Sequence, residues 1–149
     1  MRLGHEHTDI QPEMITSRWQ ERFWLEWKLQ PNNTTYHLDL QFDLYGVISE
    51  ESIERMLDTL RSQHTILQSR FLDKNRKIVR EVDPKMPLQF SRYTANEHKE
   101  LEALLYAEHR RPFDLENEAP YRFVLVRRSP TEHRLMLCFH HIAIDGLSL

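Results

Sequence analysis

Two strand-like segments joined by a short turn constrain the fold of this chain most. Residues 121–128 and 133–140 are both rich in apolar side chains, and residues 129–132 between them read Ser-Pro-Thr-Glu. Proline and small polar residues favour turns, and strands on either side of a short turn pair most easily with each other. We therefore expect an antiparallel hairpin near the end of the sequence, around which the other elements pack.

The upstream sequence begins with a helical pattern and continues with a strand pattern. Ser17 and Gln20 form a capping box at the start of an expected helix over residues 17–29. We assign to the core the aromatic residues that recur on this helix at helical spacing, Trp19, Phe23 and Trp27. Residues 36–44 then alternate between apolar and polar side chains, which predicts a half-buried strand with its apolar side chains at 38, 40, 42 and 44.

Further elements follow in the same alternating manner. Ser49 begins a second expected helix, which carries the apolar stripe Ile53, Met56, Leu57 and Leu60. Short strands are expected at 66–72, 77–82 and 88–90. A second capping box, Thr94 with Glu97, begins a third helix that Pro112 closes. This order predicts an α+β fold in which helices cover a mixed sheet.

Composition excludes several classes of protein. The 149 residues carry 20 Lys and Arg against 23 Asp and Glu, a formal net charge of -3, so the chain has no basic footprint for nucleic acid. No apolar stretch approaches the length of a membrane helix. The single cysteine, Cys138, lies in an apolar run, and we expect a buried, reduced thiol and a cytoplasmic location.

The last segment of the sequence holds the residues with the clearest chemistry. His140 and His141 stand at the end of an expected strand, Asp145 follows four residues later, and Gly146 closes the turn. Neighbouring residues of a strand point to opposite faces, so the two imidazoles are expected to have different roles. One of them can serve as a general base near neutral pH. Spacing alone favours a structural pair or part of a metal site over catalysis, and we assign no metal to these residues.

The segment from His140 to Gly146 resembles the H-H-x-x-x-D-G signature of the condensation domains of nonribosomal peptide synthetases. These domains belong with the chloramphenicol-acetyltransferase-like enzymes. Three other segments agree with the family in order: residues 17–25 with S-x-x-Q-x-R-x-W-x-L, 63–71 with R-H-E-x-L-R-x-x-F, and 112–122 with P-F-D-L…P-L-x-R. Together these resemblances extend over residues 17–149.

The resemblance implies a fold and a set of roles. Residues 1–149 form the N-terminal lobe of a two-lobed, chloramphenicol-acetyltransferase-like fold and end just after the signature. His141 is the catalytic residue in amide bond formation, and His140, Asp145 and Gly146 are structural residues of the active site. Acyl or peptidyl carrier proteins bring both substrates on phosphopantetheine arms, and no cofactor is tightly bound. The implied context is antibiotic biosynthesis.

The sequence also departs from the family. Gln63 and Gln68 stand where the family has arginines, so the residue that supports Asp145 is left open between Gln68, Arg70 and the arginines of the first helix. Because the second lobe is missing, we expect the isolated chain to be inactive and to cover its apolar surface with that lobe or by self-association. A non-catalytic carrier-binding module and an ester-forming relative remain alternatives.

Overall fold

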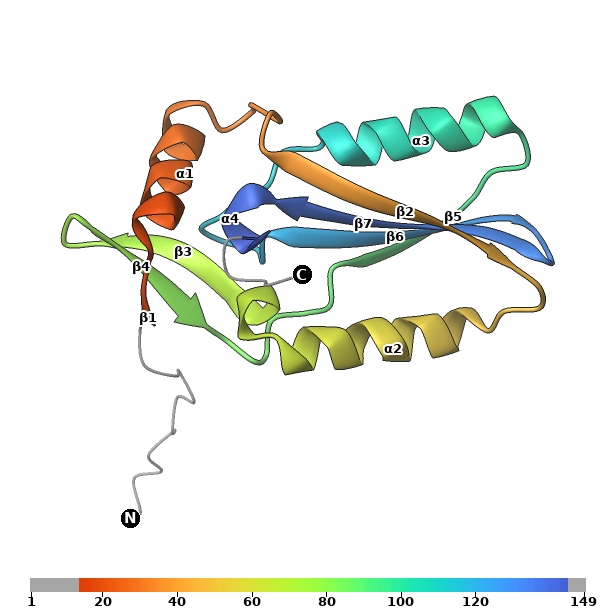
Figure 1. Cartoon of the computed structure of the whole chain (residues 1–149), viewed down its shortest axis with the longest axis horizontal. Helices are drawn as coiled ribbons and strands as arrows, with labels where there is room; N and C mark the ends of the chain where they lie inside the picture. Colours follow the sequence, from red (N-terminus) through yellow and green to blue (C-terminus); the bar gives the residue numbers. More distant parts are fainter. Residues whose placement is uncertain (1–13, 145–149) are drawn as a thin grey trace, which may run out of the picture.

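The computed structural model describes residues 14–144, and its centre is a mixed sheet between two helices (Figure 1). Helix α3 (His98–Arg110) lies on one face of this sheet and α2 (Glu50–Gln63) on the other. The strand order is β2 (His37–Tyr45), β7 (Glu132–His140), β6 (Tyr121–Ser129) and β5 (Phe90–Thr94). Strands β5 and β6 are parallel, and the other neighbouring pairs are antiparallel. The expected α+β fold with a helix-covered mixed sheet is confirmed.

A smaller antiparallel sheet lies at one end of the molecule, beside helix α1 (Arg18–Leu29) (Figure 1). Its strands follow the order β1 (Met14–Ile15), β4 (Lys77–Val82) and β3 (Ser69–Lys74). The indole Nε1 of Trp24 on α1 donates to the carbonyl of Phe71 on β3, at 3.1 Å. Phe71 itself is completely buried. Helix α1 and the small sheet therefore share one apolar core, and none of the helices within residues 14–144 is long and apolar enough to cross a membrane.

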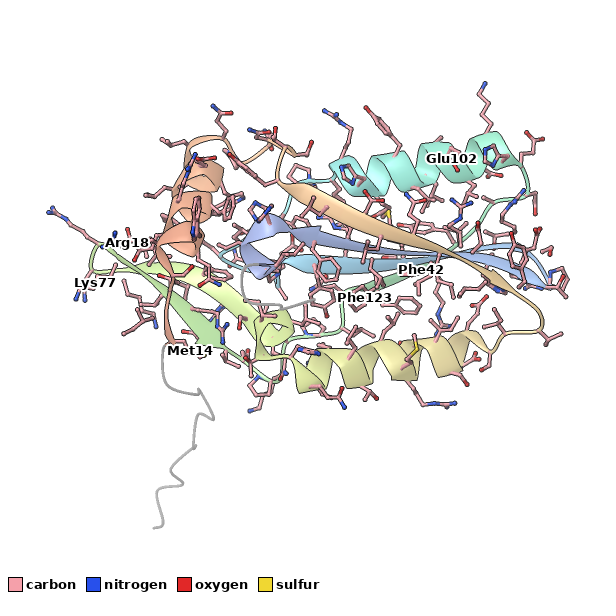
Figure 2. All side chains as sticks on the ribbon, in the orientation of Figure 1. Met14, Arg18, Phe42, Lys77, Glu102 and Phe123 are labelled. Carbon is pink, nitrogen blue, oxygen red and sulfur yellow. The ribbon has the colours of Figure 1, made fainter. Side chains whose placement is uncertain are left out.

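The expected hairpin is confirmed as β6 and β7, which pair through a turn at residues 130 and 131. Side chains of residues 121–126 are all buried, so β6 is covered on both of its faces. On the face toward α2, Phe123 (Figure 2) is paired with Leu137, and Leu125 is paired with Leu135. Arg122 and Cys138 are paired on the opposite face, toward α3. Cys138 is a buried free thiol, and burial raises its pKa to about 11.

The capping box that was expected at the first helix is confirmed. Ser17 Oγ accepts from the Gln20 N–H at 3.1 Å, and Gln20 Oε1 accepts from the Ser17 N–H at 3.0 Å. The assignment of Trp19 to the core is wrong, because this residue is 58% exposed. The buried positions are instead 20, 23, 24 and 27, which recur every three or four residues and form the inward stripe.

Strand β2 forms as expected, but its apolar face is covered only at Leu44, which is half-buried, and the one buried residue, His37, lies on the polar face. Leu38, Leu40 and Phe42 (Figure 2) are between 40 and 46% exposed. The polar side chains of His37 and Asp39 point toward α3 instead, where both contact His109. Those two side chains find partners on α3, so their burial carries little cost. On an edge strand, partners from another element thus decide which face is covered.

Of the three short strands expected between residues 66 and 90, one has the expected boundaries and two are shifted. Strand β4 begins and ends as expected. The strand expected at 66–72 starts only at Ser69, because Ile66 and Leu67 are both buried in a short 3-10 turn, η1 (Thr65–Gln68). The strand expected at 88–90 runs from Phe90 to Thr94.

Two expectations about helices are also corrected. On α2, Ile53 and Leu57 are buried, but Met56 is exposed because it lies beside the inward stripe. The capping box expected from Thr94 and Glu97 is wrong, since Thr94 ends β5 and Glu97 is an N-cap without a side-chain bond.

The two Ser/Thr positions give a direct test of these cap assignments. Ser17→Ala removes a real cap and should lower the free energy of unfolding by about 1 kcal/mol. The matched substitution Thr94→Ala, at an exposed strand end, should change it by less than about 0.5 kcal/mol. Urea denaturation of both variants measures this difference, and equal losses would contradict the cap assignment.

Candidate active site at the end of strand β7

The two histidines of the sequence motif lie at a junction between a strand and a helix. His140 is the last residue of β7, and His141 is the first residue of the short helix α4 (His141–Ile144). The expectation that both occupy one strand is therefore wrong. The His141 N–H donates to the carbonyl of Tyr36, at 2.8 Å, and the His140 N–H donates to that of Pro120, at 3.0 Å. The backbone of the pair is thus held between the segments that lead into β2 and β6.

The imidazole of His140 is buried among aromatic rings. Only 2% of the residue is exposed, and the ring lies 6.0 Å from that of His37, between ring centroids. Its Nδ1 accepts from the Ile142 N–H at 3.1 Å, which assigns the proton of the neutral ring to Nε2. Burial lowers the pKa of His140 to about 3, with smaller contributions from His37 and His141. His140 is therefore neutral at physiological pH.

His141 has a different environment. The residue is half-buried, and its ring lies against that of Phe23 on α1, with 4.7 Å between centroids and 32° between planes. Its Nδ1 is buried and has no hydrogen-bond partner among residues 14–144. The ring is therefore exposed at atoms other than Nδ1.

Gln20 links α1 to the turn that carries the histidines. Besides completing the capping box, its Nε2 donates to the carbonyl of Ile142, at 3.4 Å. One amide side chain thus fixes both the start of α1 and the start of α4. The capping pattern indicated the first of these roles, but the second depends on a contact 122 residues away in the sequence.

A buried imidazole that the sequence did not indicate, His37, supports the pair from β2. Its Nδ1–H donates to the carbonyl of His109 near the end of α3, at 2.6 Å. The ring also lies 4.8 Å from that of Phe113, between centroids. Burial lowers the pKa of His37, which favours the neutral form of this second imidazole beside His140.

Arg122 is the buried charge behind this cluster. Its guanidinium donates to three carbonyls that follow or end α3, those of Glu108, Arg111 and Pro112, at 2.5–3.1 Å. It also lies 3.9 Å from the centre of the Phe113 ring. The carbonyls at a helix C-terminus carry partial negative charge, which compensates a cation there. The signal in the sequence was Arg122 itself, the one charged residue among residues 121–126 and the arginine of the P-L-x-R segment.

The expected supports of Asp145 hold other partners in the described part of the chain. Gln68 Nε2 donates to the carbonyls of Arg61 and Ser62, at 2.9 and 3.2 Å, and so satisfies the end of α2. Arg70 forms an ion pair with Glu81. Asp145 and Gly146 lie outside the described residues, so their expected roles stay predictions.

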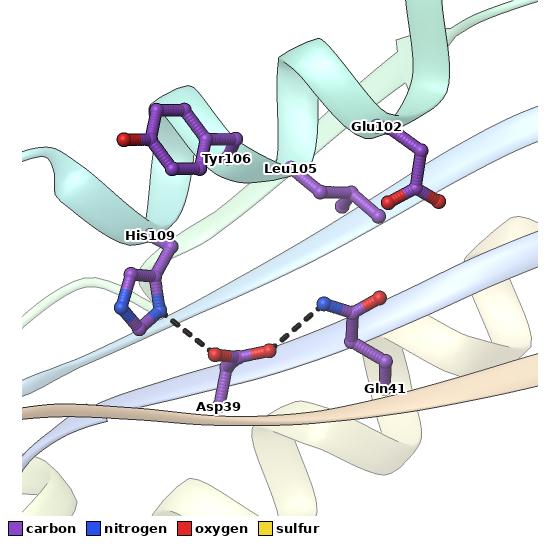
Figure 3. Close-up of a pocket in the computed structure, with 6 residues that line it drawn as sticks. All are labelled: Asp39, Gln41, Glu102, Leu105, Tyr106 and His109. Atoms are coloured by element: carbon purple, nitrogen blue, oxygen red, sulfur yellow. Dashed lines mark hydrogen bonds and ion pairs between the residues drawn. The ribbon is translucent and has the colours of Figure 1, made fainter. Parts of the chain in front are cut away.

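A separate groove of about 330 Å³ lies between β2 and α3 (Figure 3). Asp39 Oδ1 lies 2.8 Å from His109 Nδ1, off the direction of a hydrogen bond, and Asp39 Oδ2 accepts from Gln41 at 2.8 Å. The other residues that line the groove are Glu102, Leu105 and Tyr106. Neither histidine of the pair lines this groove. Its polar contacts join α3 to the edge strand.

The arrangement of elements is that of solved condensation domains. The starter condensation domain of rhizomide synthetase RzmA superposes on 89% of this chain with a TM-score of 0.81 and 18% sequence identity. The four-domain nonribosomal peptide synthetase AB3403 superposes on 95% of it with a TM-score of 0.82 and 16% identity. The chain spans 33% of the first structure and 11% of the second. At these identities the likeness shows the fold.

Sequence comparison gives the family. The sequence model of the condensation domain matches residues 10–149, and the chain belongs to the condensation domain family of nonribosomal peptide synthetases. The hybrid PKS-NRPS synthetase pvhA of Talaromyces variabilis is 30% identical over 92% of the chain. Cyclosporin synthetase simA of Tolypocladium inflatum is 32% identical over 87% of it. The chain spans 4% of the first relative and 1% of the second.

The buried state of His140 predicts a dependence of stability on pH. Because the folded pKa of His140 lies below the unfolded value of about 6.5, the unfolded chain binds the extra proton, and stability falls as the pH falls from there. Between pH 7 and pH 5 the loss due to His140 alone should be about 2 kcal/mol. His140→Gln keeps an acceptor but does not titrate, so its stability should depend less on pH by that amount.

Urea denaturation at the two pH values measures this difference. The control is His98→Gln, since His98 is an exposed residue of α3. If the wild type and His140→Gln lost the same stability between pH 7 and pH 5, His140 would not be the buried neutral group described here.

Proposed function

We propose that this chain forms the N-terminal lobe of a condensation domain and supplies His141 for amide bond formation. The reacting partners are a donor thioester and an acceptor amine, each on the phosphopantetheine arm of a carrier protein, as is usual in this family. The supporting observation is the contrast between the two histidines. His140 is buried and neutral, whereas His141 is half-buried, has its ring fixed against Phe23, and lies where β7 ends.

In this proposal the two nitrogens of His141 have different roles. With Nδ1 buried, Nε2 is the nitrogen that meets the acceptor. As the amine attacks the thioester carbonyl, a C–N bond forms, and Nε2 accepts the proton that the nitrogen loses. The C–S bond then breaks, and the proton passes to the departing thiolate, which leaves as a thiol. No net proton is gained or lost by the protein.

The surrounding residues keep this imidazole in place. The contact with Phe23, the bond from the His141 N–H to the Tyr36 carbonyl and the Gln20 link to Ile142 hold its ring and its backbone. A fixed orientation lowers the entropy cost of reaching the reactive arrangement. In the proposal, Asp145 and Gly146 continue this turn as structural residues, and no metal takes part.

The length of the chain suggests that amide formation requires more than these 149 residues. The chain spans about a third of a solved condensation domain. A tunnel that admits two pantetheine arms and excludes water requires the second lobe. We infer that the chain is inactive when it is isolated. In the cell it would work in the cytoplasm as part of a larger synthetase.

Substitution of His141 tests the proposal in the complete condensation domain that contains this chain. His141→Ala should lower the rate of amide formation at least about 100-fold, as loss of a general base does. His98→Ala, on the exposed surface of α3, should leave the rate unchanged. The product is measured by mass spectrometry after loading both carrier proteins, and the 149-residue chain alone should give none.

The alternative is a carrier-binding module without turnover, and Gln63 and Gln68 at the arginine positions of the family favour it. The same experiment separates the two functions. No product from either form, together with unchanged carrier binding, would support the module. Full turnover by His141→Ala would contradict the catalytic proposal.

A further inference from the structure

The outward face of the small sheet carries an apolar stripe that crosses all three strands. Register places Ile15 of β1 and Leu72 of β3 on either side of Val79 of β4, on one face. Ile15 is 95% exposed, and Leu72 and Val79 are half-buried. These side chains do not belong to the apolar core, whereas Phe71 and Ile78 on the opposite face do. We call Ile15, Leu72 and Val79 the outer stripe.

Cations surround this outer stripe. Arg70, Lys74 and Lys77 lie on the same face by strand alternation. Glu81 is the one acid of these strands on that face, and it accepts from Arg70 at 2.8 Å and from Lys74 at 3.1 Å. Three cations against one carboxylate make this face basic, although the whole chain has a formal net charge of -3. Figure 2 shows Lys77 at the far end of the β3–β4 hairpin, away from the main sheet.

The hairpin turn adds another cation at some cost to folding. Asn75 and Arg76 both have positive φ, 55° and 65°, as in a type I′ turn, where the second position usually carries glycine. An arginine in this region costs about 1 kcal/mol relative to glycine. The Arg76 N–H donates to Asp73 Oδ1 at 2.8 Å, which fixes the turn, while the residue itself is exposed. The turn therefore uses the backbone of Arg76 and leaves its side chain exposed to solvent.

We propose that this basic face docks an amphipathic, acidic helix of a partner protein. An apolar centre with a charged rim is the usual anatomy of a protein interface. Neighbouring strands are about 4.8 Å apart, so three strands offer a flat surface about 10 Å wide, close to the diameter of a helix. The apolar side chains of the partner would contact the outer stripe, and its carboxylates would pair with Arg70, Lys74 and Lys77. This inference requires neither His141 nor a thioester, so it stands apart from the proposed function.

A protein partner fits this face better than a membrane. The outer stripe is aliphatic and has only three members, and it contains none of the Trp or Phe side chains that anchor interfacial proteins. Anionic vesicles therefore serve as the competing probe in the experiment.

The probe is a synthetic helical peptide of about 18 residues with leucines along one side and glutamates on both flanks, titrated into the ¹⁵N-labelled chain. Amide shifts should concentrate in β1, β3 and β4. Lys77→Glu should weaken binding about three- to tenfold, and so should Ile15→Ser, whose exposed side chain is not needed for folding. Lys99→Glu, an equal charge change on α3, should have no such effect.

A scrambled peptide of the same composition separates docking from general charge attraction. It should bind at least about threefold more weakly, because its leucines no longer share one side. Four results would overturn the proposal: no binding, equal binding of both peptides, equal losses in Lys77→Glu and Lys99→Glu, or Lys77-dependent binding to phosphatidylglycerol vesicles without binding to the peptide.

Discussion

Burial of the β6–β7 hairpin on both faces is the constraint on which the rest of this structure depends. A hairpin covered by α2 on one side and α3 on the other leaves no water for the polar side chains that it carries. Three of its buried polar side chains contact groups that lie outside the hairpin. Arg122 donates to the carbonyls at the end of α3, His140 accepts from the turn that follows it, and His133 lies 3.6 Å from a Glu50 oxygen at the start of α2.

The site follows from the same constraint. Because β7 is covered until its last residue, the imidazole of His140 is buried and neutral, and the chain turns into α4 immediately after it. That turn places His141 against α1, where Phe23 and the Tyr36 carbonyl hold it half-buried. Adjacent histidines thus differ in environment because the covered strand ends between them. The proposed chemistry concerns this one junction.

Sequence patterns predicted the parts of the fold that local interactions determine. The capping box at Ser17 and the β6–β7 turn depend on residues a few positions apart, and both were predicted. The exposure of the apolar side chains of β2 and of Trp19 depends on where α3 and the inward stripe of α1 lie, so alternation in β2 and helical spacing in α1 were misleading. In the site, the motif indicated the histidines. His37 escaped notice, and Arg122 was matched to a family segment without a role, because backbone carbonyls, their acceptors, leave no mark in a sequence.

The central claim is that His140 is a buried neutral imidazole whose Nδ1 accepts a backbone hydrogen bond behind an accessible His141. Imidazole ¹⁵N chemical shifts of the two histidines, followed by NMR from about pH 7.5 to about pH 5, test it most directly. The account predicts that His140 keeps an unprotonated Nδ1 and a protonated Nε2 throughout, without titrating. Titration of His140 near the ordinary histidine pKa, or a proton on its Nδ1, would contradict it.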